Sequence, residues 1–580
     1  MILQTTGGFN PRQFGDTLFP LGPWCAQANT NPQRTALDLP SEEDLDLESI
    51  TSSLMSIIGE QLYPTLNEVH NVDFSKSVWN HSLGTYLRVL APLVITRYNL
   101  VRRVVQHLPC DEFTQVSVDQ ARVITNDRTE LLVSINSHAW NHQLFSELCT
   151  SLNLKPKMPI EATWITTPDP SASRSLHAES SGSIKKLVMS LCNFRASHSR
   201  NLLIRTMLPS RLEFALALRM KTLPYFWSED ISHTSHIDQD MRHRLEEAVH
   251  GRDGHEQVLL RTIVKRLPRV FVEDFALARE VAAARLPQAP KRVFTSNLHQ
   301  SSDVFLLWLS EKQDRGTQVT IAQHGGVHSL CRDLPADIAS EINLADRYIA
   351  WGNRSFVSPK VSSGPTLVNI GVKRLTRPMD SNDGPLLIVL DASYRYPSIP
   401  RGMNGSRFRY AELVNDLISK LDSETINRIV LRPYRGSEIW DDSLIELVTK
   451  DPRVEIDSSF PPIKSLFSKS KMVVSTSLGT TFFQTLHHRI PTAILLDPTL
   501  SPLSDWAQRG LDPLRQSSVL FSDPTQLAFH INRTFSDLSD WWGGTTVQSA
   551  ISQFESEMSP TCSSPIRYFL NQLTTGRRTT

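Results

Sequence analysis

From Pro290 onward, short β-branched runs alternate with stretches of helical spacing, and this alternation constrains the fold more than any other feature of the sequence. Short apolar runs separated by helices predict βα units and a parallel sheet buried on both faces. The first series has expected strands at residues 293–295, 319–322, 347–351 and 367–370, with a helix over 302–312.

A second series follows residues 378–384, which form a linker by their composition. Its expected strands are 386–390, 428–432, 472–475 and 492–496, with a helix near 409–421. Two such series predict an α/β chain with two Rossmann-like domains that face a cleft. We expect these domains to span 1–376 and 377–535, and a helical tail over 536–580 to pack back on the first domain.

The first 289 residues differ in character, and we expect helical insertions there. Residues 1–40 indicate a loop with one short strand that ends at 21–25. The acidic residues at 41–44 suit a helix start, where the helix dipole is positive. One apolar helix face follows at i, i+3 and i+4 spacing, formed by Leu54, Ile57, Ile58, Leu62 and Leu66.

The longest apolar stretch, 86–100, is broken by two arginines and a proline, which predicts a buried helix rather than a membrane span. Residues 110–290 are polar and are expected to be mostly helical. Within them, 162–166 favours a strand, and the Ser/Pro-rich residues 168–183 favour a loop.

Composition excludes some classes of protein. Lys+Arg and Asp+Glu number 60 each, so the formal net charge of +0 provides no overall attraction to nucleic acid. Six scattered cysteines without a Cys-x-x-Cys pair favour reduced thiols over disulfides or a cysteine zinc site. The N-terminus lacks a basic stretch followed by an apolar run, so we expect no signal peptide.

Ligands of open parallel sheets bind at the carboxyl ends of the strands, so the residues that follow each expected strand are site candidates. The first such segment is 295–299, with Asp303 one turn further on. Its small polar groups could face the cleft. The alternative is ordinary helix capping by Ser301, Ser302 or Asp303.

The second candidate is Gln323-His324-Gly325-Gly326. Two glycines let backbone amides approach a ligand closely or adopt positive φ. His324 could donate a hydrogen bond to a phosphate or a developing anion. The alternative is a plain Gly-Gly turn beside a buried histidine.

The third candidate follows the strand 472–475 and is rich in hydroxyls. Hydroxyls and free amides at a helix N-terminus form an anion site, which predicts a bound phosphate or pyrophosphate. The alternative is a Ser/Thr-rich helix cap. No Gly-Lys-Ser/Thr follows, so this is not a P-loop. The candidate residues are Ser475, Thr476, Ser477, Gly479, Thr480 and Thr481.

Other polar groups are weaker candidates. Arg432 and Arg435 follow a strand and could bind a phosphate, although a surface ion pair is equally expected. Asp238 and Asp240 have the spacing of a metal-binding pair, but their polar surroundings favour a solvated helix end. The histidines between 233 and 255 lack metal-ligand spacing on a clear element.

Further stretches complete a pattern that runs nearly from end to end, although residues 110–285 are not diagnostic. They are Leu21-Gly22-Pro23-Trp24-Cys25; Asn67 and His70 with Trp79 and Gly84; Thr295-Ser296-Asn297 with Asp303; Glu341, Ala345-Asp346 and Trp351-Gly352; Gly479-Thr480-Thr481-Phe482, Ile490-Pro491-Thr492 and Asp497-Pro498. With Gln323-His324-Gly325-Gly326 and Ser475-Thr476, they resemble a family of bacterial transferases. That family is encoded among surface-polysaccharide genes, for O-antigen or capsule, and has a GT-B glycosyltransferase-like architecture.

Five residues depart from the family's pattern. Gln484 stands one helical turn after Thr480 and Thr481, where an acid is expected. Ser340 stands where the family tends to have histidine, and Asn353 where it often has a second tryptophan. Val327-His328 replaces an aromatic–glycine pair. In GT-B enzymes the acid near this loop often holds the ribose or sugar hydroxyls of the donor, so donor preference and activity both depend on Gln484.

The resemblance implies a glycosyltransferase that moves a sugar from a CMP-, CDP-, UDP- or GDP-linked donor to a growing surface glycan or a lipid-linked acceptor. The first domain would present the acceptor, and the second would bind the donor. His324 is the first candidate for the base, with Asp303 and Glu341 as alternative acids. No metal is required, because amides and an arginine can replace it. The implied donor-binding residues are Gln323, Gly325, Gly326, Arg432, Ser475, Thr476, Ser477, Gly479, Thr480, Thr481 and Gln484.

The resemblance also implies a cytoplasmic location, with peripheral association at the inner face of the membrane. Two other functions stay open. One is a polyol-phosphate transferase similar to teichoic-acid polymerases, which also use His-Gly and Ser/Thr loops. The other is a non-catalytic scaffold that binds nucleotide sugars, which the uncharged Gln484 would suit.

Overall fold

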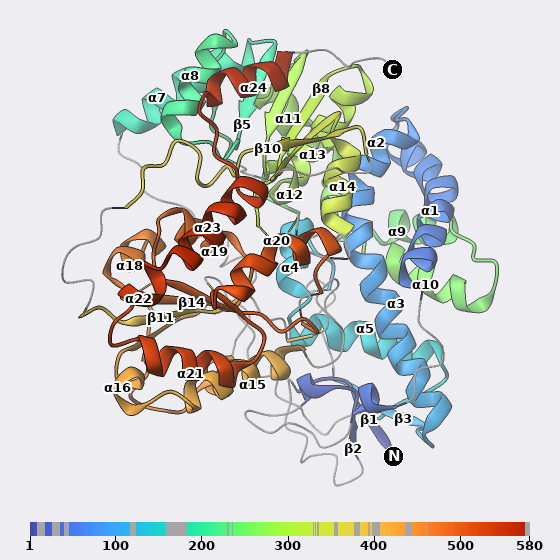
Figure 1. Ribbon diagram of the computed structural model, residues 1–580. Helices are drawn as coiled ribbons and strands as arrows, with labels where there is room; N and C mark the ends of the chain where they lie inside the picture. The colour runs from blue at the N-terminus through green and yellow to red at the C-terminus, as the bar shows by residue number, and fades with distance from the viewer. Residues whose placement is uncertain are drawn as a thin grey trace.

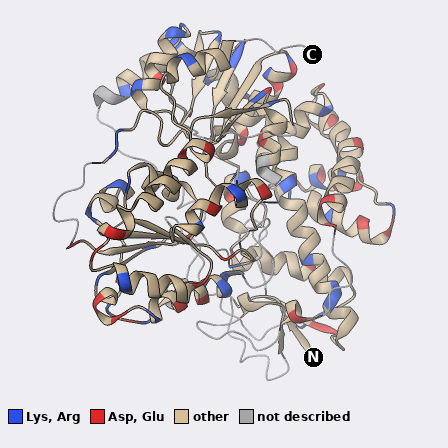
Figure 2. Ribbon diagram, viewed as in Figure 1, with Lys and Arg blue, Asp and Glu red and all other residues tan. Residues whose placement is uncertain are grey.

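The computed structural model contains three parallel sheets with helices packed around them (Figure 1). It describes residues 1–7, 18–25, 35–39, 46–116, 123–157, 183–228, 231–234, 236–326, 328, 330, 332, 336–352, 358–375, 383–391, 395–396, 406–434, 444–459, 461–500 and 502–574. The expected strand at 162–166, the helix start at 41–44 and the loop up to residue 182 lie outside these ranges. Figure 2 shows basic and acidic residues mixed along the described elements, in keeping with the net charge.

The first large sheet has six strands. Their order is β10 (Val361–Gly364), β9 (Arg347–Trp351), β8 (Gln318–Ala322), β7 (Arg292–Thr295), β5 (Asn201–Ile204) and β6 (Pro224–Tyr225). The strands expected at 293–295, 319–322 and 347–351 are confirmed, as is the helix over 302–312, which is α13 (Asp303–Asp314). The sheet also takes β5 and β6 from a region that was expected to be mostly helical.

The strand expected at 367–370 is wrong, because these residues form turns. Leu367 and Ile370 are buried against the core that includes Phe483 of the second large sheet's helices. The side-chain amide of Asn369 donates to the carbonyl of Phe483, 3.1 Å away. Tertiary packing therefore accounts for this apolar run, while the more polar β10 provides the edge strand.

The second large sheet also has six strands. Their order is β13 (Glu455–Ile456), β12 (Ile429–Arg432), β11 (Leu386–Val389), β14 (Met472–Ser475), β15 (Thr492–Leu495) and β16 (Leu520–Phe521). All four strands expected here are confirmed, and α15 (Ser406–Ser419) is the expected helix. The central strands are continuous apolar runs because helices cover both faces of the sheet. Two parallel sheets of this kind confirm an α/β fold with two Rossmann-like units.

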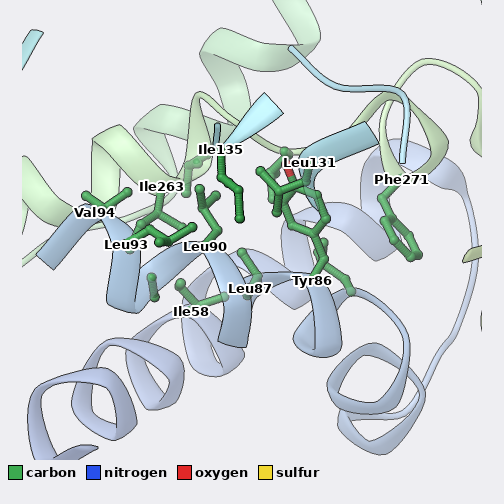
Figure 3. Close-up of a cluster of buried hydrophobic side chains, with 14 of the residues drawn as sticks. Ile58, Tyr86, Leu87, Leu90, Leu93, Val94, Leu131, Ile135, Ile263 and Phe271 are labelled. Atoms are coloured by element: carbon green, nitrogen blue, oxygen red, sulfur yellow. The ribbon is translucent and has the colours of Figure 1, made fainter. Parts of the chain in front are cut away.

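A third sheet lies at the N-terminus, where only one short strand was expected. Its order is β2 (Leu18–Pro20), β1 (Ile2–Gln4), β3 (Glu112–Thr114) and β4 (Lys155–Lys157). Helices α1 (Leu47–His70), α3 (Leu83–His107), α5 (His138–Ser151) and α10 (Gly254–Val264) pack against one another, and α5 of this group contacts β3 and β4 (Figure 1). The expected buried helix over 86–100 is confirmed within α3, and Figure 3 shows Leu90 and Leu93 of that helix close to Ile263 of α10.

The helices near the C-terminus contact elements of both Rossmann-like units. In α24 (Pro565–Thr574), the ring of Phe569 lies 5.7 Å from that of Phe294 in β7, and the Tyr568 hydroxyl donates to the carbonyl of Ser363 at 2.7 Å. In α23 (Thr545–Met558), the side chain of Met558 packs on Gly510 of α20 (Asp505–Gln516). Among the described residues, we find no helix both long and apolar enough to cross a membrane.

Candidate functional site

The loops that follow β8 and β14 contact each other. A Cβ atom on Gly326 would lie 2.4 Å from a ring carbon of Phe483 and 2.8 Å from the carbonyl oxygen of Leu478. Phe483 is in α19 (Thr480–His487), and Leu478 is in the loop that leads into it. Each loop follows the carboxyl end of its strand, which is the edge of a parallel sheet where ligands usually bind. The ligand-binding edges of the two large sheets therefore face each other here. Position 326 has to be glycine, because the backbone carbonyl of Leu478 lies too close to leave room for a side chain.

Gln323 fixes the start of the first loop. Its side-chain amide donates to the carbonyl of Gly325 at 2.7 Å, and its oxygen accepts from the backbone N–H of Trp351 at 2.9 Å. The side chain is buried. Gln323 therefore holds the loop against β9 and sets the position of His324.

Two histidines and a glutamate converge beside this loop, and we call His324, His328 and Glu341 the His324 group. One ligand-type atom of each lies within 4.8 Å of the other two. The rings of His324 and His328 are perpendicular, with centroids 4.5 Å apart. A Cβ on Gly325 would lie 2.9 Å from Nε2 of His328, so this glycine makes room for the second imidazole.

Glu341 enters the group from α14 (Ala336–Leu344), and its side chain is buried. The Tyr348 hydroxyl donates to its Oε2 at 3.3 Å, the Gln300 side-chain amide donates to its Oε1, and Nε2 of His299 lies 3.4 Å from Oε1. These contacts orient the carboxylate. Burial, with a smaller contribution from nearby His299, lowers the pKa of His328 to about 4, so its imidazole is neutral at neutral pH.

Asp303 lies at the start of α13 and is buried. Its Oδ2 accepts the backbone N–H of Arg128 at 2.7 Å, at the beginning of α4 (Arg128–Ser134). Ser302 is the N-cap of α13 and accepts from the backbone N–H of Phe305. The capping interpretation of this segment is therefore confirmed for Ser302, while the carboxylate of Asp303 joins two helices.

In the Ser/Thr loop, two hydroxyls hold the backbone in place. Ser475 donates to the carbonyl of Ser477 at 2.7 Å, and Thr476 donates to the carbonyl of Val389 at 2.9 Å. The hydroxyl of Tyr410 lies 2.6 Å from that of Thr476. Ser475 and Thr476 thus shape the loop.

The remaining hydroxyls are available at the start of α19. The N-cap is Gly479, so no side chain caps the first amides of this helix. The hydroxyls of Ser477, Thr480 and Thr481 are half-buried and make no hydrogen bond within the described part of the chain. Gln484 is also half-buried, one turn further along. Uncapped amides and hydroxyls at a helix N-terminus can bind an anion.

Two of the other candidates, Arg432 and Asp238, make contacts within the fold. Arg432 forms a buried ion pair with Asp457, and it also donates to the carbonyl of Pro461 at 3.0 Å. Arg435 lies outside the described residues. Asp238 is the N-cap of α9 (Gln239–Glu247) and accepts the backbone N–H of Met241, which confirms the helix-end interpretation.

Sequence reasoning missed a second polar cluster, at the carboxyl edge of the N-terminal sheet. Thr6 follows β1, and its hydroxyl lies 2.8 Å from Nδ1 of His138 and 2.7 Å from the hydroxyl of Tyr396. The guanidinium of Arg395 contacts Nε2 of His138. Trp24, from the Leu-Gly-Pro-Trp-Cys stretch, packs beside Tyr396 with ring centroids 5.3 Å apart. That stretch was the only sequence signal near this cluster.

The His324 group was also only partly foreseen. His324 and Glu341 were candidates, whereas His328 stood out solely as a departure from a family pattern. His328 follows His324 by four positions, which brings side chains together in a helix, but the two histidines lie in a loop, so their spacing alone does not indicate that their rings meet.

A family model described as LIC12162 family transferase matches residues 2–573. No curated protein matches the sequence. Among solved structures, MurG of Acinetobacter baumannii is similar at 9% identity and a TM-score of 0.30, covering 64% of this chain and 98% of that chain. The α,α-trehalose 6-phosphate synthase of Burkholderia multivorans is similar at 11% identity and a TM-score of 0.35, covering 66% of this chain and 100% of that chain. At these scores the two likenesses say nothing about substrate.

Proposed function

This chain belongs to the LIC12162 family of transferases, and we propose that the group it transfers is a sugar carried by a nucleotide. The contact between Gly326 and the Leu478–Phe483 segment carries the proposal. It brings an anion-binding helix start and a group of imidazoles and a carboxylate to the same junction of two Rossmann-like units. A donor phosphate and an acceptor hydroxyl can therefore be held next to each other.

The donor phosphates bind at the start of α19. The free amides of that helix, together with the hydroxyls of Ser477, Thr480 and Thr481, donate to phosphate oxygens. They also stabilise the negative charge that grows on the departing nucleotide as the sugar–phosphate bond breaks. Gln484, one turn along, is placed to hydrogen-bond hydroxyls of the donor.

The acceptor hydroxyl binds at the His324 group. Its oxygen forms the new bond to the anomeric carbon, and its proton passes to this group as the nucleotide leaves with the electrons of the broken C–O bond. Glu341, held by Tyr348 and Gln300, provides the negative charge that favours uptake of a proton nearby. The carboxylate of Asp303 accepts the backbone N–H of Arg128 at the start of α4, so we propose His324 and Glu341 rather than Asp303 as the groups that act on the acceptor.

We also propose the class of acceptor and the place in the cell where the protein acts. A growing surface glycan or its lipid-linked precursor is the acceptor that the family resemblance supports. Such acceptors are held at the inner face of the cytoplasmic membrane, where the protein would act by peripheral association.

The test uses the purified full chain with a panel of CMP-, CDP-, UDP- and GDP-sugars and lipid extracts as the acceptor. We expect one nucleotide class to bind and to be released as product only when acceptor is present. His324→Ala should abolish release of the nucleotide. His243→Ala, which removes an exposed histidine elsewhere on the protein, should release the nucleotide as the wild type does. Failure of every donor to bind would overturn the proposal. Binding without release would instead support a non-catalytic scaffold, for which the uncharged Gln484 is the observation in favour.

A further inference from the structure

We propose that the His324 group is a binding site for a zinc-class divalent transition-metal ion. The ligands would be one imidazole nitrogen each from His324 and His328 and a carboxylate oxygen of Glu341, which already lie within 4.8 Å of one another. They come from two different elements, the loop after β8 and helix α14. Because these three donor atoms already lie close together, they need little rearrangement to bind a single ion.

The separations between the three donor atoms are compatible with a single bound ion. Metal bonds to imidazole and carboxylate are about 2.0–2.2 Å long, so donors on a tetrahedral ion lie about 3.3 Å apart. Separations of up to 4.8 Å require each donor to move inward by less than the length of a bond. Rotation of the two imidazoles in the loop can supply that movement, because Gly325 leaves the ring of His328 without a neighbouring side chain on that side.

The donor types select the metal. Two imidazoles and one carboxylate suit zinc and its first-row neighbours, whereas calcium and magnesium prefer oxygen donors alone. Three protein ligands leave a fourth position for water or a substrate oxygen, as in catalytic zinc sites. Calcium or magnesium, which prefer oxygen ligands alone, is therefore not the expected occupant of this site.

The surroundings of the ligands support a metal rather than a simple hydrogen-bonded cluster. Nδ1 of His328 is buried and has no hydrogen-bond partner among the described residues. The Tyr348 hydroxyl and the Gln300 amide already hold the carboxylate of Glu341, as outer partners orient metal-binding carboxylates. His299 lies against the same carboxylate, with Nε2 3.4 Å from Oε1.

The role of the ion rests on the proposed function, but its presence does not. With the ion bound, its three ligands would no longer take up the acceptor's proton; the ion would hold the acceptor oxygen at its open position and make the hydroxyl acidic enough to lose its proton to water. The donor site at α19 would still bind nucleotide without the ion. Metal content and nucleotide binding can therefore fail independently.

The experiment is equilibrium dialysis of the full-length protein against zinc, followed by elemental analysis. We expect about one ion per wild-type chain and an affinity at least about 100-fold lower in His328→Ala and in Glu341→Gln. Tyr348→Phe, which keeps all three ligands, should weaken binding about 10-fold. His243→Ala, which removes an exposed histidine elsewhere, should bind zinc as the wild type does.

Two outcomes would overturn the site: a wild-type chain without stoichiometric zinc, or ligand variants with wild-type affinity. Thermal unfolding separates misfolding from loss of a ligand. Zinc should raise the Tm of the wild type and of His243→Ala, because it binds the folded state, and should leave the Tm of Glu341→Gln unchanged. Replacement of zinc by cobalt(II) should give visible absorption bands of a four-coordinate ion in the wild type only.

Discussion

The hydroxyl of Tyr396 lies 2.8 Å from Nδ1 of His138, although 258 positions separate the two residues. Tyr396 belongs to the segment between β11 and α15 of the second large sheet, whereas His138 opens α5 beside the N-terminal sheet. The same hydroxyl lies 2.7 Å from that of Thr6. The pair thus joins two parts of the molecule through a buried polar contact.

Tyr396→Phe should lower the free energy of unfolding by about 1–2 kcal/mol, because a buried hydrogen-bonded hydroxyl is lost and its partners stay buried. Urea denaturation measures the change. Tyr98→Phe is the matched control, since the Tyr98 hydroxyl makes no hydrogen bond to a described residue and its loss should change stability by less than about 0.5 kcal/mol. If the two substitutions changed the free energy of unfolding equally, the hydrogen bonds of the Tyr396 hydroxyl would not stabilise the fold.

The central strands of the two large sheets could be predicted from the sequence because they are local apolar runs, whereas β5, β6 and the edge strands β10, β13 and β16 were not predicted. The strand expected at 472–475 is β14 itself, and the Ser/Thr loop and the His-Gly-Gly loop then follow at the sheet edges. Local patterns indicate such elements, since a strand buried on both faces is a near-continuous apolar run. The position of a loop after its strand is fixed by chain order alone.

The N-terminal sheet could not be predicted in the same way. The three residues of β1 pair with β2, and two of them also pair with β3, which begins at Glu112, so the strand depends on long-range pairing more than on its own sequence. The turn at 367–370 shows the reverse case, in which an apolar run is buried by another unit rather than by strand pairing. The contact of His324 with His328 likewise depends on how a loop folds.

Gly326→Ala should destabilise the protein by about 1–3 kcal/mol, because the added methyl group would overlap the Phe483 ring and the Leu478 carbonyl. The backbone carbonyl cannot rotate away as a flexible side chain would. Thermal unfolding measures the effect. Gly254→Ala is the control: apart from its chain neighbours and the backbone of its own helix, no atom lies within 4 Å of the added carbon, and the stability of this variant should stay close to that of the wild type. A wild-type Tm for Gly326→Ala would show that the two loops do not need their close contact.

Stability should fall as the pH decreases from 6.5 to about 4, with His142 as one cause. Burial lowers the pKa of His142 from 6.5 to about 4. In this pH range the unfolded chain binds a proton at His142 and the folded chain does not, so stability is full above pH 6.5 and declines below it. The loss from this residue is about 3 kcal/mol and is complete near pH 4.

His142→Gln tests that assignment. In the folded protein, Nε2 of His142 accepts the backbone N–H of Val116 at 2.9 Å, so Nδ1 carries the proton and faces the Thr5 hydroxyl at 2.7 Å. A glutamine can accept and donate in the same places but does not titrate. Denaturation curves at several pH values should therefore show a flatter dependence for His142→Gln, and the original dependence for the exposed control His243→Ala. An unchanged slope in His142→Gln would remove His142 as a cause.

Replacing Thr480 and Thr481 with valine should weaken binding of the donor nucleotide by at least about 100-fold, because each of the two lost hydrogen bonds to a charged phosphate contributes about 1.5–3 kcal/mol and each 1.4 kcal/mol is about tenfold in affinity. Valine has nearly the shape of threonine, and the two hydroxyls support no other described contact, so the fold should survive. Isothermal titration with the nucleotide sugar that the wild type binds best measures the affinity. Thr150→Val is the control, since it removes a helix hydroxyl that only bonds back to the carbonyl of Ser146. Wild-type affinity in the double valine variant would place the donor phosphates away from the start of α19.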